Sequence, residues 1–298
     1  MNVILCKTRE EDHYMLNEKK VAYLGPKASF THIAVSSLFG MPGLLPQLTI
    51  PDCIEAVVAG NVDYAVVPLE NTLEGSVPMT IDYLFHGSEL FINAEISIPI
   101  EQHLMVNEKQ ARFLDEIESI NSHPHALAQC HQYLQDHFRR VPLIQTTSTA
   151  AAAKYISEKP DEKIAAIGNR LAAEKYGLHI AKENIQDFHS NHTRFVVLSN
   201  LKQKLESKGH SEKPKTTLMV KLPEDDRSGV LHQVLSVFAW RRLNLSKIES
   251  RPLKTGLGNY FFIIDVLESE DHPMMKGAME ELTALNCSVR TFGSYYIY

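Results

Sequence analysis

Residues 191–195 place four kinds of chemistry at one point in the chain. They read Asn-His-Thr-Arg-Phe and lead directly into the apolar run 196–198, which predicts a strand. An amide, a hydroxyl, a guanidinium and an aromatic ring at the mouth of a rigid strand could hold a small anion, because Arg offers a planar fork of donors that fits a carboxylate. The structural alternative is a turn, since Asn and Thr are common turn and cap residues and a lone Arg is usually solvated.

A second cluster of polar side chains contains four histidines, which raises the question of a metal site. If Pro124 begins a helix, His125, His131 and His137 are six residues apart and point to three separate faces of it. We therefore predict no metal site there. The four cysteines are scattered without a Cys-x-x-Cys pair, which argues against a disulfide framework and against a thiolate metal site.

Composition excludes several classes of protein. The chain has 298 residues, of which 44% are hydrophobic and 22% charged, and this favours a globular protein of about two domains. No apolar stretch is long enough to span a membrane, and the charged first twenty residues lack a secretory signal, so we expect a cytoplasmic protein. The formal net charge of -6 gives no basic surface for nucleic acid, and an anionic ligand would need local cations such as Arg194.

An apolar run, a turn and a helical pattern follow one another five times in the first two thirds of the chain. The apolar runs cover residues 21–24, 63–67, 117–120, 143–147 and 164–167, and the third leads into a long helix that ends near His137. Strands that alternate with helices indicate an α/β fold, in which ligands bind beyond the carboxyl ends of the strands. The polar residues of these turns are candidate ligand contacts, with helix capping as the alternative for each hydroxyl.

The last third of the chain has a different pattern. The polar stretch 202–215 reads as a linker. Beyond it we predict a strand at 216–222, a helix that Gly229 opens, strands at 245–250 and 260–266, a helix at 274–285 and a strand at 289–292. This βαββαβ order is typical of a small ferredoxin-like domain.

Taken together and in order, the motifs of the chain resemble those of monofunctional prephenate dehydratases that end in an ACT regulatory domain. The motifs are Gly25-Pro26-x-x-Ser29-Phe30-Thr31, Val67-Pro68-Leu69-Glu70-Asn71, Ser122-His123-Pro124, Ser148-Thr149-Ala150-Ala151, Asn191-x-Thr193-Arg194-Phe195, Gly229-Val230-Leu231 and Glu249-Ser250-Arg251-Pro252. The resemblance implies a leader at 1–18, which could be disordered, a catalytic domain at 19–200 with two lobes like those of periplasmic binding proteins, a linker at 201–215 and an ACT domain at 216–298.

The resemblance also implies an activity and roles for particular residues. Enzymes of this family are lyases that convert prephenate to phenylpyruvate in L-phenylalanine biosynthesis, with loss of carbon dioxide and water and without metal or organic cofactor. By this resemblance Thr193 hydrogen-bonds the departing hydroxyl and Arg194 clamps a carboxylate, while Asn191 orients the substrate. The implied substrate contacts are Ser29, Phe30, Glu70, Asn71, Ser122, His123, Ser148, Thr149 and Phe195.

The implied regulation rests on the C-terminal domain. ACT domains bind free amino acids between subunits, so the resemblance implies L-phenylalanine as an allosteric inhibitor and a homodimer or homotetramer. The implied effector contacts are Gly229, Val230, Leu231, Glu249, Ser250, Arg251 and Pro252. The structural alternative for residues 230–238 is that they form the apolar face of a helix that packs in the core.

The chain departs from the family pattern at several positions, and two other functions stay open. Ala28 stands where the family usually has Gly, and His125 where Gln is common. On either side of Gly229, Ser228 stands where the family usually has Pro and Val230 where it usually has Ala. One alternative is an arogenate dehydratase, in which a carboxylate such as Glu70 would pair with the substrate ammonium. The other is an amino-acid sensor that uses the same cleft without turnover.

Overall fold

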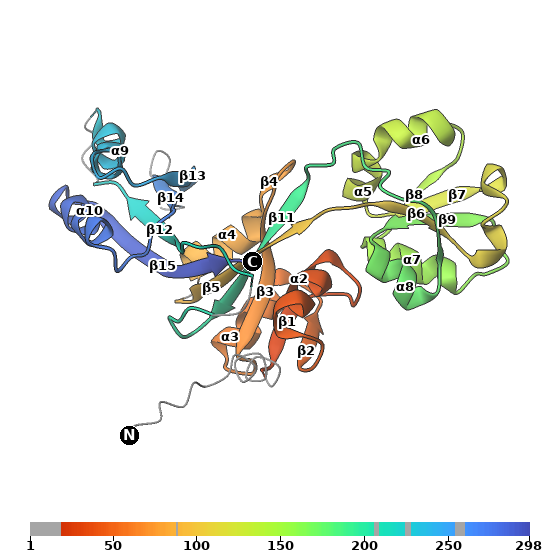
Figure 1. Ribbon diagram of the computed structural model, residues 1–298, viewed down its shortest axis with the longest axis horizontal. Coiled ribbons are helices and arrows are strands. Elements are labelled where there is room, and N and C mark those ends of the chain that lie inside the picture. The colour runs from red at the N-terminus through yellow and green to blue at the C-terminus, as the bar shows by residue number, and fades with distance from the viewer. Residues whose placement is uncertain (1–18, 88, 206–208, 224–227, 254–259) are drawn as a thin grey trace, which may run out of the picture.

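The computed structural model of the chain describes residues 19–87, 89–205, 209–223, 228–253 and 260–298 (Figure 1). The expected leader, 1–18, lies outside the described residues, as do 206–208 of the expected linker. The molecule has two α/β lobes and a C-terminal α+β domain, and the first lobe lies between the second lobe and the C-terminal domain (Figure 1). This arrangement confirms the predicted fold class.

The first lobe is a mixed sheet with helices on its faces. β1 runs parallel to β2 and β3, and β11 returns antiparallel between β3 and β5. The near-continuous apolar runs in these strands reflect burial on both faces of the sheet. Its elements are β1 (Val21–Leu24), α2 (Phe30–Phe39), β2 (Leu44–Gln47), α3 (Ile50–Val58), β3 (Tyr64–Asn71), β4 (Gly75–Ser76), α4 (Pro78–Asp82), a π-helical turn (Tyr83–Gly87), β5 (Phe91–Pro99) and β11 (His192–Ser199).

The second lobe is inserted between β5 and β11, so two chain segments connect the lobes (Figure 1). Its five-stranded sheet has the order β10-β6-β9-β7-β8. Alanines on α7 and α8 let these helices pack closely against the sheet. The elements are β6 (His103–Val106), 3-10 turns (Glu108–Gln110 and Leu114–Glu116), β7 (Ser119–Ser122), α5 (Pro124–Gln129), α6 (His131–His137), β8 (Leu143–Gln145), α7 (Thr149–Ser157), β9 (Ile164–Gly168), α8 (Arg170–Tyr176) and β10 (His179–Lys182).

The single long helix expected from Pro124 to His137 is wrong, because the helix divides at Cys130 into α5 and α6. Asp187 occupies the break: its N–H donates to the Gln129 carbonyl at 2.7 Å, and its carboxylate accepts from the Gln132 N–H at 3.2 Å. These bonds replace those that a continuous helix would make. Among the described residues, no three His, Cys, Asp or Glu side chains group as metal ligands would.

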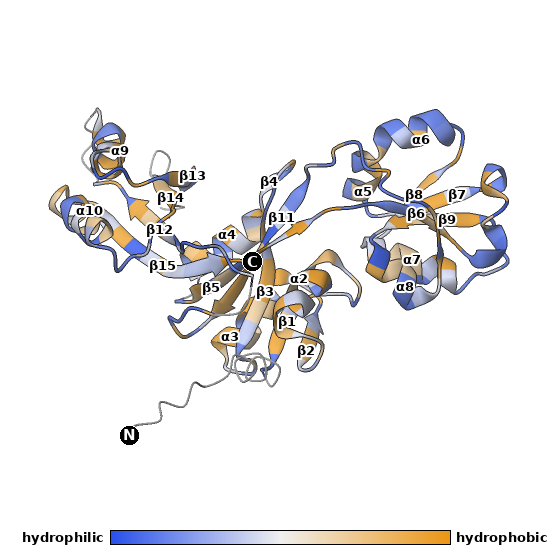
Figure 2. Ribbon diagram, viewed as in Figure 1, coloured by the Kyte–Doolittle hydropathy of each residue, from blue (hydrophilic) through white to orange (hydrophobic). Residues whose placement is uncertain are grey.

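The C-terminal domain has the predicted βαββαβ order. Its elements are β12 (Lys215–Lys221), α9 (Val230–Trp240), β13 (Leu245–Pro252), β14 (Tyr260–Val266), α10 (Pro273–Ala284) and β15 (Ser288–Ile297). Apolar residues of both helices and of the sheet fill one core. Figure 2 shows that hydrophobic residues are also concentrated in the strands of the two lobes. None of the described helices is long and apolar enough to cross a membrane.

The C-terminal domain continues the sheet of the first lobe, which the sequence pattern did not predict. β15 extends well past the expected end at Phe292 and pairs in parallel with β5, so that one ten-stranded sheet joins both units within the described residues. Gly293 makes the approach possible: its φ is +129°, and a Cβ there would lie 2.5 Å from the Ile92 carbonyl oxygen. Phe261 and Phe292 also pack with Phe85 of the first lobe.

Candidate active site

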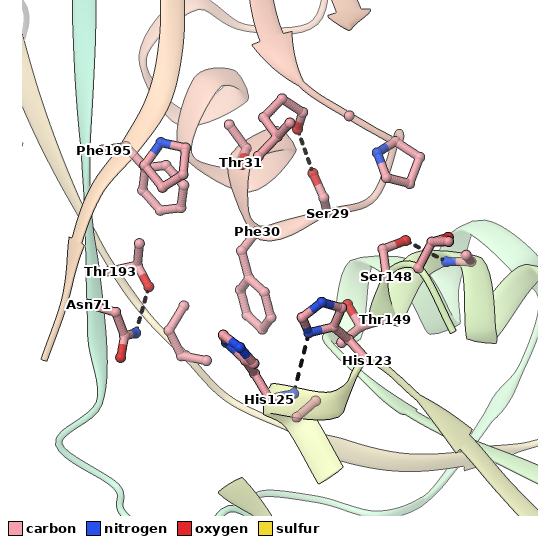
Figure 3. Close-up of a pocket in the computed structure, with 18 of the residues that line it drawn as sticks. Ser29, Phe30, Thr31, Asn71, His123, His125, Ser148, Thr149, Thr193 and Phe195 are labelled. Atoms are coloured by element: carbon pink, nitrogen blue, oxygen red, sulfur yellow. Dashed lines mark hydrogen bonds between the residues drawn. The ribbon is translucent and has the colours of Figure 1, made fainter. Parts of the chain in front are cut away.

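A cleft of about 1050 Å³ lies between the two lobes, where the carboxyl ends of their parallel strands meet. From the first lobe it is lined by the residues that follow β1 and β2 and by the end of β3; from the second lobe it is lined by those that follow β7 and β8. Figure 3 shows Thr193, Asn71 and Phe195 on one side and Ser148, Thr149 and His123 on the other. The Phe30 ring lies between these two groups (Figure 3).

Thr193 and Asn71 form a fixed pair of polar side chains at one wall of the cleft. They are register partners on β11 and β3, and the Asn71 Nδ2 donates to the Thr193 Oγ1 at 2.9 Å. The Asn71 Oδ1 accepts from the N–H groups of Leu73 and Glu74, which fixes the orientation of the amide. Because the Thr193 oxygen accepts this bond, its own hydrogen is free to be donated to a bound molecule.

Two helices direct their N-termini at the cleft. Ser29 caps α2 and Ser148 caps α7, their hydroxyls accepting from the N–H groups of His32 and Ala151 at 3.2 and 3.0 Å. The remaining N–H groups of each first turn have no partner within the helix and favour a bound anion. Lys27 lies beside α2 at the lip of the cleft. Burial lowers the pKa of His32, and the charges of Lys175 and then Lys27 lower it further.

A third helix start brings two imidazoles into the cleft. His123 caps α5 with its Nδ1, which accepts from the His125 N–H at 3.3 Å, and so carries its ring proton on Nε2. Burial, helped by the charge of His125 and opposed by Glu74, lowers the pKa of His123, which is therefore neutral near pH 7. His125 pairs with Glu74 of the opposite lobe, and Gln129 also donates to this carboxylate at 3.2 Å. These contacts connect the lobes across the cleft.

A further contact between the lobes involves the first turn. The Asn169 Nδ2 donates to the Ala28 carbonyl at 2.9 Å, and the Ala28 side chain packs in the second lobe's core. Ala28 has a φ of +67°, a conformation that Gly adopts without strain. The structure therefore gives a backbone reason to expect Gly at this position and shows that Ala is tolerated.

The comparisons with known proteins show which family the chain belongs to. The family model for prephenate dehydratase matches residues 21–203 and the ACT domain model matches residues 216–287. The chain is 55% identical over 283 residues to the prephenate dehydratase of Bacillus subtilis, covering 94% of this chain and 99% of the relative. The chain belongs to the prephenate dehydratase family.

Solved structures of the family share the fold. A prephenate dehydratase from Arthrobacter aurescens, solved in complex with L-Phe, superposes with a TM-score of 0.81 at 35% identity, over 93% of this chain and 89% of that one. The enzyme from Staphylococcus aureus gives a TM-score of 0.79 at 28% identity, over 93% of this chain and 99% of that one. Because each match covers 93% of this chain, it includes residues of both the two-lobed unit and the C-terminal domain.

The structure brings most of the predicted substrate contacts of this family together. The cleft is lined by the predicted residues Ser29, Phe30, Asn71, His123, Ser148, Thr149, Thr193 and Phe195. Ser122 does not line it, because its buried hydroxyl donates to the Ile167 carbonyl at 2.7 Å. Asn191 is 1% exposed and does not line it either, and its amide has no hydrogen-bond partner among the described residues.

The geometry contradicts one expectation for the family motif, that Arg194 clamps a substrate carboxylate. Side chains alternate along a strand, so Arg194 points away from the face on which Thr193 lies. Its Nε and Nη2 donate to Glu95 at 2.9 and 2.8 Å, its Nη2 also donates to Asp265 at 2.8 Å, and its Nη1 donates to Glu70. Burial works to lower the pKa of Arg194, but Glu95 and Asp265 outweigh it and raise that pKa further.

Glu70 shares this placement, so it too lies outside the cleft. It is the register partner of Arg194, one residue before Asn71 on β3. The idea that Glu70 pairs with the ammonium of arogenate therefore has no support from its position. Glu74, at the turn between β3 and β4, does line the cleft.

The predicted effector residues of the ACT domain lie on two elements. Gly229, with a φ of +88°, precedes α9, whose first turn contains Val230 and the partly exposed Leu231. Residues 249–252 end the edge strand β13. Glu249 pairs with Arg251 and accepts from Ser76 of the first lobe at 2.6 Å.

Sequence reasoning missed Gln102 and Gln129 in the cleft. Gln102 lies in the segment between the lobes, is 2% exposed and has an Oε1 without a partner among the described residues; its Nε2 donates to Gln129 at 3.4 Å. No turn or helix start marks this position in the sequence, so only the path of the chain between the lobes identifies it.

Proposed function

We propose that the protein is a prephenate dehydratase that converts prephenate to phenylpyruvate, carbon dioxide and water in L-phenylalanine biosynthesis, which makes it a carbon-oxygen lyase. The observation that supports this most directly is the Thr193 hydroxyl, which faces the cleft with its oxygen occupied by Asn71. In the reaction the bond between the ring and its carboxylate breaks and releases carbon dioxide, its electrons enter the ring, and the ring hydroxyl leaves and takes up a proton from solvent to form water.

Thr193 assists the step that most needs help, the departure of the hydroxyl. An aliphatic hydroxyl is too weak an acid to transfer its proton completely near neutral pH, so it acts by donating a hydrogen bond as negative charge develops on the leaving oxygen. Asn71 holds the Thr193 oxygen at 2.9 Å and thereby directs the hydroxyl hydrogen away from itself.

The carboxylates of the substrate are held without Arg194. The N-termini of α2 and α7 supply backbone donors; Ser29, Ser148 and Thr149 lie at these ends, and Lys27 lines the same cleft. We expect Lys27→Gln to raise the KM for prephenate and to leave kcat within about twofold, because Lys27 attracts the dianion equally before and during the reaction.

The ring of the substrate fits the apolar part of the cleft. Phe30 and Phe195 contribute aromatic surface, and Ile100 and Ala126 add aliphatic surface. An apolar environment favours the loss of the ring carboxylate as neutral carbon dioxide. We assign Phe30 and Phe195 to enclosing the ring.

The ACT domain supports feedback regulation by L-phenylalanine, which we propose binds at 229–231 and 249–252 between two subunits. The matched ACT domain and the L-Phe complex of the Arthrobacter aurescens relative support this proposal. An amino acid that binds two states of the protein unequally shifts their populations. A site shared by two ACT domains requires a homodimer or homotetramer.

The direct test is to incubate the purified protein with prephenate, follow phenylpyruvate, and repeat with added L-phenylalanine and with arogenate as substrate. We expect turnover of prephenate and inhibition by L-phenylalanine. Faster turnover of arogenate would favour the alternative, with Glu74 as the partner of its ammonium. No turnover of either substrate, with saturable binding of an amino acid, would identify a sensor instead.

A further inference from the structure

An ionic network lies behind the Thr193–Asn71 pair, on the opposite face of the same two strands. Within the described part of the chain it contains four cations and four carboxylates: Arg194, Lys215, Lys247 and Arg251 with Glu70, Glu95, Glu249 and Asp265. We call these eight residues the ionic network. It joins the first lobe to the ACT domain.

The inner part of the network is buried and connects to the catalytic strands. Glu95 and Asp265 have side chains that are 3% and 2% exposed, and Arg194 and Lys215 both contact them. Arg194 adjoins Thr193 on β11, and Glu70 adjoins Asn71 on β3. The Arg194–Glu70 pair is therefore joined through one peptide bond on each strand to Thr193 and Asn71 of the cleft.

The outer part of the network reaches the proposed effector segment. The Lys247 Nζ lies 3.0 Å from Glu70, 3.0 Å from Glu249 and 2.7 Å from the Ser76 hydroxyl, and its side chain is only 10% exposed. Glu249 also contacts Arg251 and Ser76. Burial works to raise the pKa of Glu249, but bonds from Ser76 and Lys247 and the charge of Arg251 lower it, so Glu249 is charged.

We propose that Lys247 of the ACT domain is a positioning residue for Thr193 and Asn71, and that the path Glu249–Lys247–Glu70–Arg194 transmits effector binding to them. The positioning role rests on the contacts above, and the regulatory part rests on the proposed function of the ACT domain.

The charges suggest how the path works. Lys247 is shared between one carboxylate of each unit, Glu249 and Glu70. An amino acid at 249–252 presents an ammonium to Glu249 and a carboxylate to Arg251, and so competes with Lys247 for Glu249. Lys247 then loses one of the two carboxylates that hold it, so its contact with Glu70 loosens and Glu70 no longer fixes Arg194 as firmly. Because these groups are largely shielded from solvent, salt screens the change poorly.

The test is a double-mutant cycle in the full-length protein with Glu70→Gln, Lys247→Met and both together. Lys202→Met is the matched control, because Lys202 of the linker pairs with Glu270 of the ACT domain outside the network. For each variant we would measure kcat and KM for prephenate, inhibition by L-phenylalanine, L-phenylalanine binding by calorimetry, and hydrogen exchange of β3 and β11.

We expect Lys247→Met to lower kcat by about 2- to 30-fold with little change in KM, and to weaken inhibition more than binding. Lys247→Arg should restore part of both. Glu70→Gln should have the same effects on kcat and on inhibition. The double variant should lose no more kcat than the stronger single variant, because both residues lie on one path. Exchange at β3 and β11 should increase in both, and Lys202→Met should behave as wild type.

Additive effects of the two substitutions, or unchanged exchange and unchanged kcat in folded Lys247→Met protein, would overturn the proposal. Failure of the proposed function is distinguishable: the wild type would not turn over prephenate, whereas exchange at β3 and β11 in Lys247→Met would still report the connection.

Discussion

Replacing Arg194 tests whether this residue binds substrate or holds the structure together. In Arg194→Met, the buried carboxylates of Glu95 and Asp265 keep Lys215 as a cation partner but lose the guanidinium that bridges them. Removing one partner of a buried ion pair typically costs about 3–5 kcal/mol. We expect the free energy of unfolding in urea to fall by about this amount, because one buried negative charge is left uncompensated.

Two further variants separate this effect from a general loss of charge. Arg194→Met with Glu95→Gln restores the balance of charge and should regain more than half of the lost stability. Arg170→Met, which removes an ion pair with the half-exposed Glu183, should change stability far less. Kinetics of the folded Arg194→Met protein should show a lower kcat and little change in KM. A large rise in KM with normal stability would show that Arg194 binds the substrate and would refute the reasoning.

Two other predictions concern the joint between the units and the response to acid. Gly293→Ala should cost about 2–6 kcal/mol of stability in urea, because its Cβ would collide with the Ile92 carbonyl at a strained φ, whereas Gly60→Ala, with a φ of +73° in open space, should cost far less; equal losses would contradict this. The pKa of His103 lies below its ordinary 6.5, through burial and then Arg170, with Glu101 and Glu183 opposing. Below about pH 6.5 the unfolded chain therefore binds a proton at His103 that the folded protein does not bind. The free energy of unfolding should fall as the pH drops from about 7.5 to 5.5. The fall should be smaller in His103→Asn, whose amide oxygen can still accept from the Asn184 N–H. The same drop in the variant would rule out His103 as a cause.

Local patterns predicted the lobes and much of the cleft for identifiable reasons. Ser29 and Ser148 lie at helix starts that follow apolar strands, and in an open α/β sheet such starts meet at one edge. The hydroxyl of Thr193 was recognisable because the motif stands at the start of a strand. In each case sequence neighbours determine the placement of the side chain.

Placements that depend on distant parts of the chain could not be predicted from the sequence. Arg194 has a motif suited to an anion, yet its partners Glu95, Glu70 and Asp265 come from three other strands and two domains. The period-two alternation of β11 places Arg194 on the face opposite Thr193, but only the fold shows which carboxylates lie on that face. Lys215, which we expected in the linker, begins β12. It is buried, and its ammonium pairs with the Glu95 carboxylate on β5.

The central claim is that the Thr193 hydroxyl assists the departure of the substrate hydroxyl. The most direct measurement compares kcat for prephenate in Thr193→Val, Thr193→Ser and Thr72→Val, the last removing a nearby hydroxyl that bonds His192 outside the lining of the cleft. We predict a loss of about 100-fold or more in Thr193→Val, substantial activity in Thr193→Ser and near wild-type activity in Thr72→Val. Wild-type kcat in folded Thr193→Val protein would contradict the account.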